Sequence, residues 1–276
     1  MKLATIRTPD GPRAARLDGS TYTGLGFSDL GELLAQPDWR TLAAGTGAST
    51  HAADNVSLAP AIPRPGKVLC VGLNYRKHIL EMGRDLPEHP TFFAKFTEAL
   101  IGPRDDIALA PESEAVDWEA ELTVVVGRTV RRADEKEAAE AIAGFTVMND
   151  VTMRDWQYRT EEWLQGKTFE GTTPLGPHLV TPDELPGGTA PALTLSTTVD
   201  GETMQKADTS DLVFGPVDLI RYASVFVTLQ PGDIIATGTP GGVGHARKPT
   251  RYLTDGSTLV TEIEGLGRLT NVARAS

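Results

Sequence analysis

Residues 116–126 read VDWEAELTVVV, and this stretch decides how the chain folds. Its second half is rich in β-branched residues, which favours a strand. However, Glu119 and Glu121 are spaced two apart, and residues i and i+2 of a strand point to the same face. The two carboxylates would lie side by side and repel each other, so they need either solvent or a partner of opposite charge.

Two explanations of the paired acids remain open at this point. A solvated sheet face is the simpler one, because antiparallel strands commonly have one wet side and buried acids are rare. A bound metal ion is the other, since two carboxylates whose Cα atoms lie about 7 Å apart can hold one hard cation. The second explanation requires another oxygen ligand elsewhere in the chain.

Asp150 is the candidate for that further ligand. It lies in NDVTMRDWQ (149–157), where the chain leaves a predicted strand and loops carry function. An Asp at this position is also typical of a turn or a helix N-cap. If all three acids converge, an all-oxygen set without a His or Cys cluster indicates Mg²⁺ or a similar hard ion.

The composition limits the partners and the compartment. The chain has 276 residues, of which 40% are hydrophobic, enough for a large core. The 26 basic and 37 acidic residues give a net charge of −11, which argues against nucleic acid and anionic membranes as partners. No apolar run of about 18 residues and no leader-like start occur. We therefore expect a cytoplasmic protein, with the single Cys70 buried as a small hydrophobe.

The order of predicted elements indicates an α+β fold and two domains. A stiff connector, APAIPRPGK (59–67), predicts a boundary near residue 62, which separates a small N-terminal domain (1–62) from a larger one (63–276). Strands dominate and no regular βαβ alternation occurs, which favours mixed or antiparallel sheets. Predicted strands lie in 68–72, 145–150 and 191–205, the last with a hairpin turn at Asp200-Gly201. Predicted helices are 28–36 with Ser28 as N-cap, 133–145 ending near Gly144, and 216–229.

Several segments resemble the fumarylacetoacetate hydrolase family in the same order along the chain, from about residue 65 to 272. They are KVLCVGLNYRKHILEMG (67–83), PTFFAKF (90–96), VDWEAEL (116–122), GFTVMNDVTMRDWQ (144–157), GKTFEGTTPLGP (166–177), PGDIIATGTPGGVG (231–244) and IEGLGRLTNVA (263–273). The resemblance implies a β-rich mixed-sheet roll with a small N-terminal domain, and a homodimer. It also implies one divalent cation held by Glu119, Glu121 and Asp150. Mg²⁺ is the expected ion, with Mn²⁺ or Ca²⁺ as alternatives.

His78 and Glu81 are the candidate catalytic pair. They lie three apart in NYRKHILE, so on a helix they share one face, and a carboxylate beside imidazole makes a better base near neutral pH. An ordinary surface pair would show the same spacing. The resemblance implies a His/Glu dyad on a segment that orders over bound substrate, and Gly83 and Pro87 bracket a polar stretch that fits a mobile segment.

An acidic molecule needs local positive charge for an anionic substrate. Lys95, Arg154 and Lys167 lie in the resembling motifs and could supply it, although solvated cations are the default. The resemblance also implies that Gln157 and Thr239 contact the substrate. TGTPGGVG is not followed by a Lys-Ser/Thr pair, so a nucleotide loop is not expected.

The resulting functional hypothesis is a metal-dependent hydrolase that cleaves a C–C bond of a 2,4-dioxo acid such as an acylpyruvate or fumarylpyruvate. His78 activates water, and the metal and Lys167 stabilise the pyruvate enolate. The same enolate arises in oxaloacetate decarboxylation and in keto–enol isomerisation, so an oxaloacetate-type decarboxylase and a 2-hydroxyhepta-2,4-diene-1,7-dioate isomerase remain alternatives. A non-catalytic metabolite-binding protein is the alternative from another class.

The chain departs from the family pattern at four positions, Phe96, Trp118, Met153 and Glu170. Phe96 and Met153 are expected to reshape the substrate cavity. The remaining candidates for chemistry are taken as structural or surface residues, namely Asp117, Asp155, His89, His178 and His245.

Overall fold

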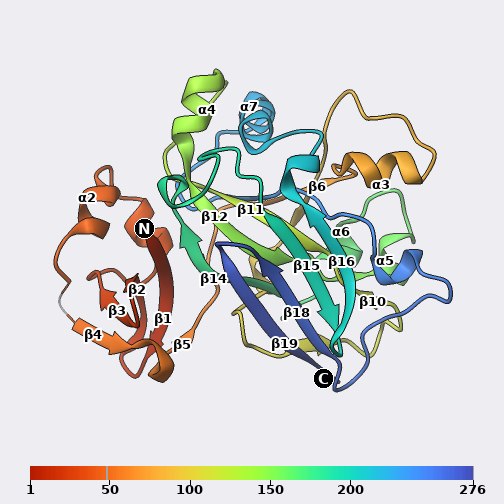
Figure 1. The fold of residues 1–276 in the computed structure, drawn as a ribbon, viewed down its shortest axis with the longest axis horizontal. Coiled ribbons are helices and arrows are strands. Elements are labelled where there is room, and N and C mark those ends of the chain that lie inside the picture. The colour runs from red at the N-terminus through yellow and green to blue at the C-terminus, as the bar shows by residue number, and fades with distance from the viewer. Residues whose placement is uncertain (48, 276) are drawn as a thin grey trace.

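Strands make up most of the fold shown in Figure 1, a computed structural model that describes residues 1–47 and 49–275. A 12-stranded sheet has the order β4-β3-β2-β1-β14-β12-β11-β17-β6-β7, with β5 paired to β1 and β8 paired to β14. A 5-stranded sheet has the order β16-β15-β18-β19-β9, and β10 pairs with β13. Both parallel and antiparallel pairs occur, which confirms the predicted strand-rich α+β fold with mixed sheets.

The element bounds are as follows. The strands are β1 (Lys2–Thr8), β2 (Gly11–Asp18), β3 (Thr21–Gly24), β4 (Ser49–Ala52), β5 (Ser57–Leu58), β6 (Val68–Gly72), β7 (Thr91–Lys95), β8 (Leu100–Ile101), β9 (Ile107–Leu109), β10 (Val116–Asp117), β11 (Ala120–Val126), β12 (Ile142–Asn149), β13 (Thr152–Met153), β14 (Thr173–Val180), β15 (Thr194–Val199), β16 (Glu202–Asp208), β17 (Ile234–Ala236), β18 (Thr258–Ile263) and β19 (Gly267–Ala275). The α-helices are α1 (Leu30–Leu34), α2 (Trp39–Ala44), α3 (Arg76–Glu81), α4 (Glu135–Ala141), α5 (Arg154–Gln157), α6 (Leu164–Lys167) and α7 (Pro216–Phe226).

Strands β11 and β12 are the centre of the large sheet. Every residue of both strands is buried. One face packs in a cluster with α7 and the second sheet, while Val125 and Met148 on the other face pack in a cluster with α1 and α2. They pair antiparallel with Ala120 opposite Asn149. This register places the start of β11 beside the end of β12, so residues 119–121 and 149–150 lie next to each other at one end of the sheet.

One apolar cluster covers the face of this centre that carries Phe145 and Val147. Phe145 and Val147 of β12 pack in one cluster with Leu219 and Ile220 of α7, and Leu195 of β15 joins the same cluster from the second sheet. In Figure 1, α4 and α7 lie beside each other above the large sheet, while β15, β16, β18 and β19 cross in front of it. On this face the core therefore joins α7 and the small sheet to the large sheet.

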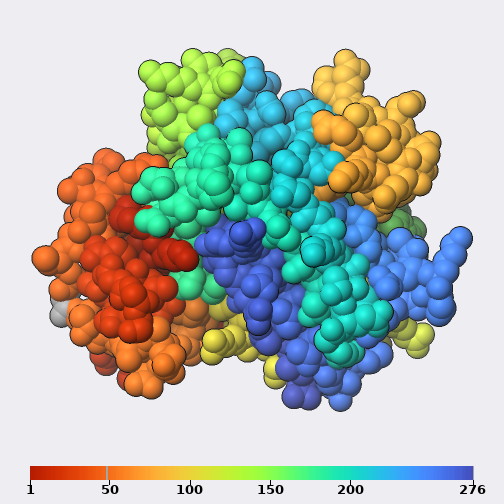
Figure 2. All heavy atoms as spheres, in the orientation of Figure 1, coloured from red at the N-terminus to blue at the C-terminus, as the bar shows by residue number. Residues whose placement is uncertain are grey.

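The first sixty residues extend the large sheet. β1 pairs with β14 through Lys2 opposite Val180. The N-terminal segment forms one end of the molecule, red to orange on the left of Figure 2. The connector around residue 62 lies between β5 and β6, and the division into domains 1–62 and 63–276 stays a prediction. None of the helices in the described residues is long and apolar enough to cross a membrane.

Three helix predictions need correction. Asp29 caps α1, accepting from the backbone N–H of Glu32, while the Ser28 hydroxyl donates to the Glu32 carboxylate instead. The helix predicted over 133–145 ends at Ala141, because β-branched and aromatic residues from 142 onward pair as β12. The helix predicted to 229 ends at Phe226.

Other predictions are confirmed. The strand at 68–72 is β6, and Asp200 and Gly201 form the hairpin turn between β15 and β16, with φ of 51° and 82°. Positive φ at both central residues is what a tight hairpin turn requires. Cys70 is fully buried, and burial raises the pKa of its thiol.

We expect Gly144→Ala to lower the melting temperature. A Cβ added at Gly144 would lie 2.3 Å from the Val180 carbonyl oxygen, so β12 and β14 would have to separate. Overpacking of this kind costs about 1–3 kcal/mol, and each kcal/mol lowers Tm by about 2–4 °C at this size. Gly215→Ala is the control, since its added Cβ meets only the Asp218 carboxylate, at 3.5 Å. Calorimetry that gave both variants the same Tm would contradict the packing account.

Candidate metal centre and active site

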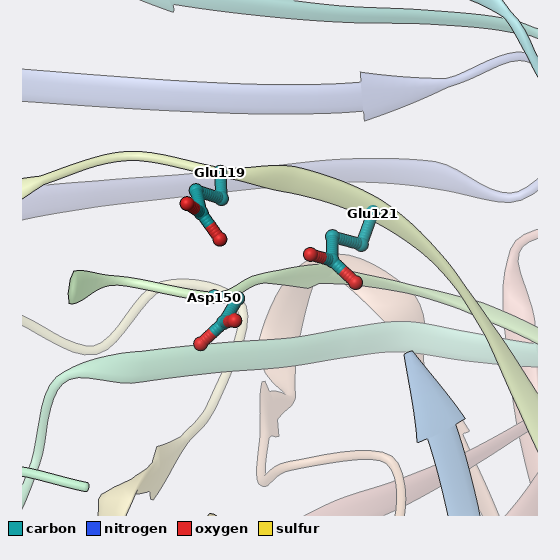
Figure 3. Close-up of side chains that lie close together, drawn as sticks. All are labelled: Glu119, Glu121 and Asp150. Carbon is teal, nitrogen blue, oxygen red and sulfur yellow. The ribbon is translucent and has the colours of Figure 1, made fainter. Parts of the chain in front are cut away.

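Three carboxylates meet where β11 begins and β12 ends. Glu119 immediately precedes β11 and Glu121 lies within it, while Asp150 follows β12. The backbone N–H of Asp150 donates to the Glu119 carbonyl oxygen at 2.8 Å, which continues the pairing of the two strands. Figure 3 shows the three side chains pointing toward one another.

The three acids are buried rather than solvated. Their relative exposures are 7% for Glu119, 1% for Glu121 and 0% for Asp150, and their ligand atoms all lie within 4.8 Å of one another. This geometry contradicts the solvated-face explanation of the paired glutamates. Three buried anions at this separation can persist only if cations or hydrogen-bond donors surround them.

Two buried lysines and an arginine supply part of that compensation. Lys95 Nζ lies 2.6 Å from Asp150 Oδ1, and Lys167 Nζ lies 2.8 Å from Asp150 Oδ2. Lys167 Nζ also lies 2.6 Å from Glu119 Oε2, while Arg154 Nη2 lies 2.7 Å from Glu119 Oε1. The two lysines lower the pKa of Asp150 to about 2, overcoming the opposing effect of burial.

Glu121 has no such partner among the described residues. The backbone N–H of Gly238 donates to its Oε2 at 2.8 Å, and no Lys or Arg forms an ion pair with it. Burial, followed by the charges of Asp150 and Glu119, raises the pKa of Glu121 well above its ordinary value. An ionised Glu121 therefore needs one more cation at this place.

A divalent cation fits this need. The donor set consists of carboxylate oxygens from three residues, the set that Mg²⁺ and Mn²⁺ prefer. The cation would supply the positive partner that Glu121 lacks. Glu119 and Asp150 already accept hydrogen bonds from Lys95, Lys167 and Arg154, but their carboxylate oxygens keep free lone pairs that can bind the ion.

Arg154 forms hydrogen bonds and ion pairs with several residues of the site. Its Nε donates to Asp117 Oδ2 at 2.8 Å and its Nη1 donates to the Gln157 side-chain oxygen at 2.9 Å, in addition to the Glu119 contact. Burial lowers the pKa of Arg154, but the charges of Glu119 and Asp117 raise it by more, so the guanidinium stays charged. With every nitrogen engaged, Arg154 orients Glu119 and Gln157.

Asp117, expected to be structural or at the surface, is a buried link between two parts of the site. Its carboxylate accepts from Arg154 and from the backbone N–H groups of Gly244 (2.6 Å) and His245 (3.0 Å). It therefore joins Arg154 to the glycine-rich segment 238–244. The one feature of the sequence that could have identified Asp117 is its position in the same motif as Glu119, VDWEAEL.

A cavity of about 270 Å³ opens onto the carboxylates. Its wall contains Val71, Gly72, Leu73, His78, Met82, Arg84, Phe93, Glu119, Glu121, Arg154, Gln157, Tyr158, Trp163, Lys167, Thr239, Val243, His245 and Ala246. Lys95 and Asp150 lie just behind this wall. The structure thus brings all ten predicted site residues to one region, with Lys95 facing Asp150 rather than the cavity.

Sequence reasoning missed several wall residues. Tyr158, Trp163, Arg84 and His245 line the cavity, although no motif singles them out. Conversely, neither Phe96 nor Met153 appears in the described wall: Phe96 is exposed, and Met153 packs in an apolar cluster with Trp118. These two departures from the family pattern therefore do not shape the cavity directly, contrary to expectation.

His78 and Glu81 lie on α3 at the edge of the cavity. A Cβ added at Gly241 would lie 3.0 Å from His78 Nδ1 and 3.7 Å from Glu81 Oε2, so both side chains approach the same point. No hydrogen bond joins these two described side chains. Burial lowers the pKa of His78, while the charges of Glu81 and Glu119 raise it by less. The His78 imidazole is consequently neutral near pH 7.

Thr239 belongs to the same glycine-rich segment. Its hydroxyl accepts a hydrogen bond at 2.8 Å from the side-chain nitrogen of Gln205, whose oxygen accepts from the Ala120 backbone N–H. The cavity wall, the start of β11 and segment 238–244 are thus connected through one buried amide.

Comparison with known proteins gives this arrangement a family. The model of the fumarylacetoacetate (FAA) hydrolase C-terminal domain matches residues 67–274. The chain belongs to the fumarylacetoacetate hydrolase family. Membership and the buried carboxylate triad together identify it as a metal-dependent enzyme of that family.

Relatives within the family carry different activities in their names. The mitochondrial oxaloacetate tautomerase Fahd2a of Rattus norvegicus is 47% identical over 215 residues, covering 78% of this chain and 68% of the relative. The 5-carboxymethyl-2-hydroxymuconate delta-isomerase of Mycobacterium smegmatis superposes with a TM-score of 0.82 at 32% identity, covering 100% of this chain and 99% of the other. The maleylpyruvate hydrolase of Sphingobium sp. SYK-6, solved with manganese and pyruvate, has a TM-score of 0.81 at 28% identity and full coverage of both chains.

The triad predicts different effects of two charge-removing variants on the Tm of the metal-free chain. Asp150→Asn should lower Tm strongly, because it leaves Lys95 and Lys167 buried without their shared partner, a loss of about 3–5 kcal/mol. Glu121→Gln should leave Tm unchanged or raise it, because it removes a buried charge that no side-chain cation compensates. Thermal denaturation after chelation with EDTA measures both.

The same two variants, together with Glu119→Gln, should lose the increase in Tm that Mg²⁺ gives the parent. Glu202→Gln changes an exposed acid outside the triad, so it is the control and should keep the increase. A Mg²⁺ effect that survives in all three triad variants would refute the metal site.

Proposed function

We propose that this enzyme catalyses metal-dependent keto–enol isomerisation of a short 2-oxo acid of the oxaloacetate class. The support is the 47% identity to an oxaloacetate tautomerase, combined with a cavity that has a cation-ready carboxylate triad at one end and a neutral histidine at its edge. Isomerisation requires a base for the C3 proton and positive charge beside the C2 oxygen. The cavity wall contains groups suited to both tasks.

Lys167 is the side chain proposed to stabilise developing charge. Its ammonium is buried, bonds to Glu119 and Asp150, and has its pKa raised by these acids despite burial. It therefore stays protonated beside the carboxylates throughout the reaction. When bound by Glu119, Glu121 and Asp150, a divalent cation such as Mg²⁺ or Mn²⁺ supplies Lewis-acid chemistry at the same end of the cavity.

His78 is the proposed proton carrier. In the keto-to-enol direction, neutral His78 takes a proton from C3 while negative charge develops on the C2 oxygen, and the imidazolium then donates that proton to the C2 oxygen. In the reverse direction it takes the enol O–H proton and returns it to C3. Glu81 stabilises the imidazolium that exists between these steps. Gln157, held by Arg154, and Thr239 are proposed to orient the substrate within the cavity.

Hydrolysis of a C–C bond in a 2,4-dioxo acid is the second candidate. It is favoured by the proximity of Glu81 to His78 and by the similarity to a maleylpyruvate hydrolase. Here His78 removes a proton from water, the water oxygen adds to C4, and cleavage of C3–C4 leaves the pyruvate enolate. Decarboxylation of oxaloacetate forms the same enolate with no attacking water.

A substrate panel separates these reactions. We expect the Mg²⁺-loaded parent to accelerate loss of the enol form of oxaloacetate, followed by its ultraviolet absorbance, and EDTA to abolish the effect. Acylpyruvate cleavage and CO₂ release are measured in parallel. Acylpyruvate cleavage without isomerisation would replace the first candidate with the second, and no turnover of any panel member would support a non-catalytic binding protein.

His78→Ala should reduce isomerisation by about 10²–10⁴-fold, the usual contribution of a general base, and leave the Mg²⁺-induced rise in Tm intact. Because the pKa of His78 is lowered from 6.5, kcat/KM should stay level near neutrality and fall only as the pH drops below that value. An acid limb centred above pH 6.5, or full activity in His78→Ala, would remove His78 from this role.

We also propose a homodimer and keep the cytoplasmic location as a prediction, although the rat relative is named as mitochondrial. Exposed Tyr222, Val225 and Phe226 on α7, beside Phe92, give the dimer an apolar surface of the kind that interfaces use. Light scattering should give twice the 29.5 kDa chain mass, and a single-chain mass would contradict the dimer.

A further inference from the structure

With a divalent cation bound, the inner end of the cavity would have positive charge for one substrate carboxylate only. Four buried carboxylates, Asp117, Glu119, Glu121 and Asp150, face three buried cations. These cations are Lys95, Arg154 and Lys167. With all of them ionised, the cluster carries one net negative charge, and a divalent cation converts this to one net positive charge. That charge matches the carboxylate of a 2-oxo acid, and a second carboxylate needs a cation elsewhere.

Arg84 is such a cation. It lines the cavity, on the segment that follows α3. Unlike Arg154 and Lys167 in the same wall, its side chain forms no ion pair or hydrogen bond with any described residue. Its sequence neighbours Asp85 and Glu88 are acidic, yet neither pairs with it. Arg84 is exposed at the cavity wall, and its five N–H donors, unpaired with these acids, are accessible to a ligand.

A turn after α3 sets the direction of the backbone at Arg84. Gly83 has φ of 68°, a left-handed turn that ends the helical segment, and the N–H of Arg84 then donates to the Ile79 carbonyl oxygen at 3.2 Å. This turn returns the chain toward the cavity, where His78 and Met82 of the same segment also lie in the wall. His245 lines the cavity too, but its Nδ1 is bonded to the Tyr252 hydroxyl.

We propose that Arg84 is a specificity-determining residue that binds the second carboxylate of an oxo-dicarboxylate, while the inner cluster binds the 2-oxo acid end. The assignment rests on the proposed function and narrows its substrate class to 2-oxo acids with a distal anionic group. Arg84 contacts substrate without taking part in proton transfer, so its removal should raise KM and leave kcat nearly unchanged.

The test uses three variants of the Mg²⁺-loaded full chain. Arg84→Gln removes the charge, Arg84→Lys keeps it without the planar donors, and Lys77→Gln removes an equal charge from α3 at an exposed position outside the cavity wall. Two ligands are compared, oxaloacetate as the dicarboxylate and pyruvate as the matched monocarboxylate. KM is measured for oxaloacetate and the inhibition constant is measured for pyruvate.

Arg84→Gln should raise KM for oxaloacetate about tenfold, the loss expected for one charge-assisted contact, with pyruvate inhibition unchanged. Arg84→Lys should lose less, and Lys77→Gln should behave as the parent. Equal weakening of both ligands, or equal effects of Arg84→Gln and Lys77→Gln, would overturn the assignment. If the parent does not turn oxaloacetate over, dissociation constants from isothermal titration replace KM, so failure of the proposed function and failure of this inference give different results.

Discussion

The site depends on one electrostatic constraint, the burial of Glu121 without a side-chain cation. Its neighbours Glu119 and Asp150 are compensated by lysine and arginine, but among the described residues Glu121 accepts from a single backbone N–H. Folding cannot leave an ionised carboxylate in this environment at low cost, so the group either takes up a proton or gains a cation. A divalent ion would neutralise Glu121 and would also supply the positive charge that the proposed chemistry uses. The stability of the sheet centre and catalysis would then depend on the same ion.

The large sheet makes this arrangement rigid. β11 and β12 are buried on both faces, and their register places Glu119 beside Asp150. Because the ligands sit on or next to paired strands while His78 and Arg84 lie on a short helix and the turn after it, the molecule separates two tasks. The sheet holds the charged groups, and the helical segment carries the groups proposed to act on the rest of the substrate.

Part of this could be predicted from the sequence. The i, i+2 spacing of Glu119 and Glu121 places both side chains on one face of any strand, so the pair was recognisable without a structure. Asp150 was a candidate from its position at a strand end, but the resemblance to the family was needed to assign all three acids to one metal site. Helix ends were less predictable: the apolar pattern of 133–145 is compatible with helix, but pairing with β11 and β14 converts residues from 142 onward into strand. Arg84, Tyr158 and His245 carry no local signal, because their place in the cavity comes from chain segments distant in sequence.

The central claim is tested most directly by a crystal structure of the chain with Mn²⁺ and pyruvate, using the anomalous signal of manganese. The account predicts one strong peak between Glu119, Glu121 and Asp150, with an oxygen of each residue at about 2.1 Å, as expected for a small hard cation. Lys167 should remain beside Glu119 and Asp150. A peak bound elsewhere, or one that leaves Glu121 without the ion, would contradict the account.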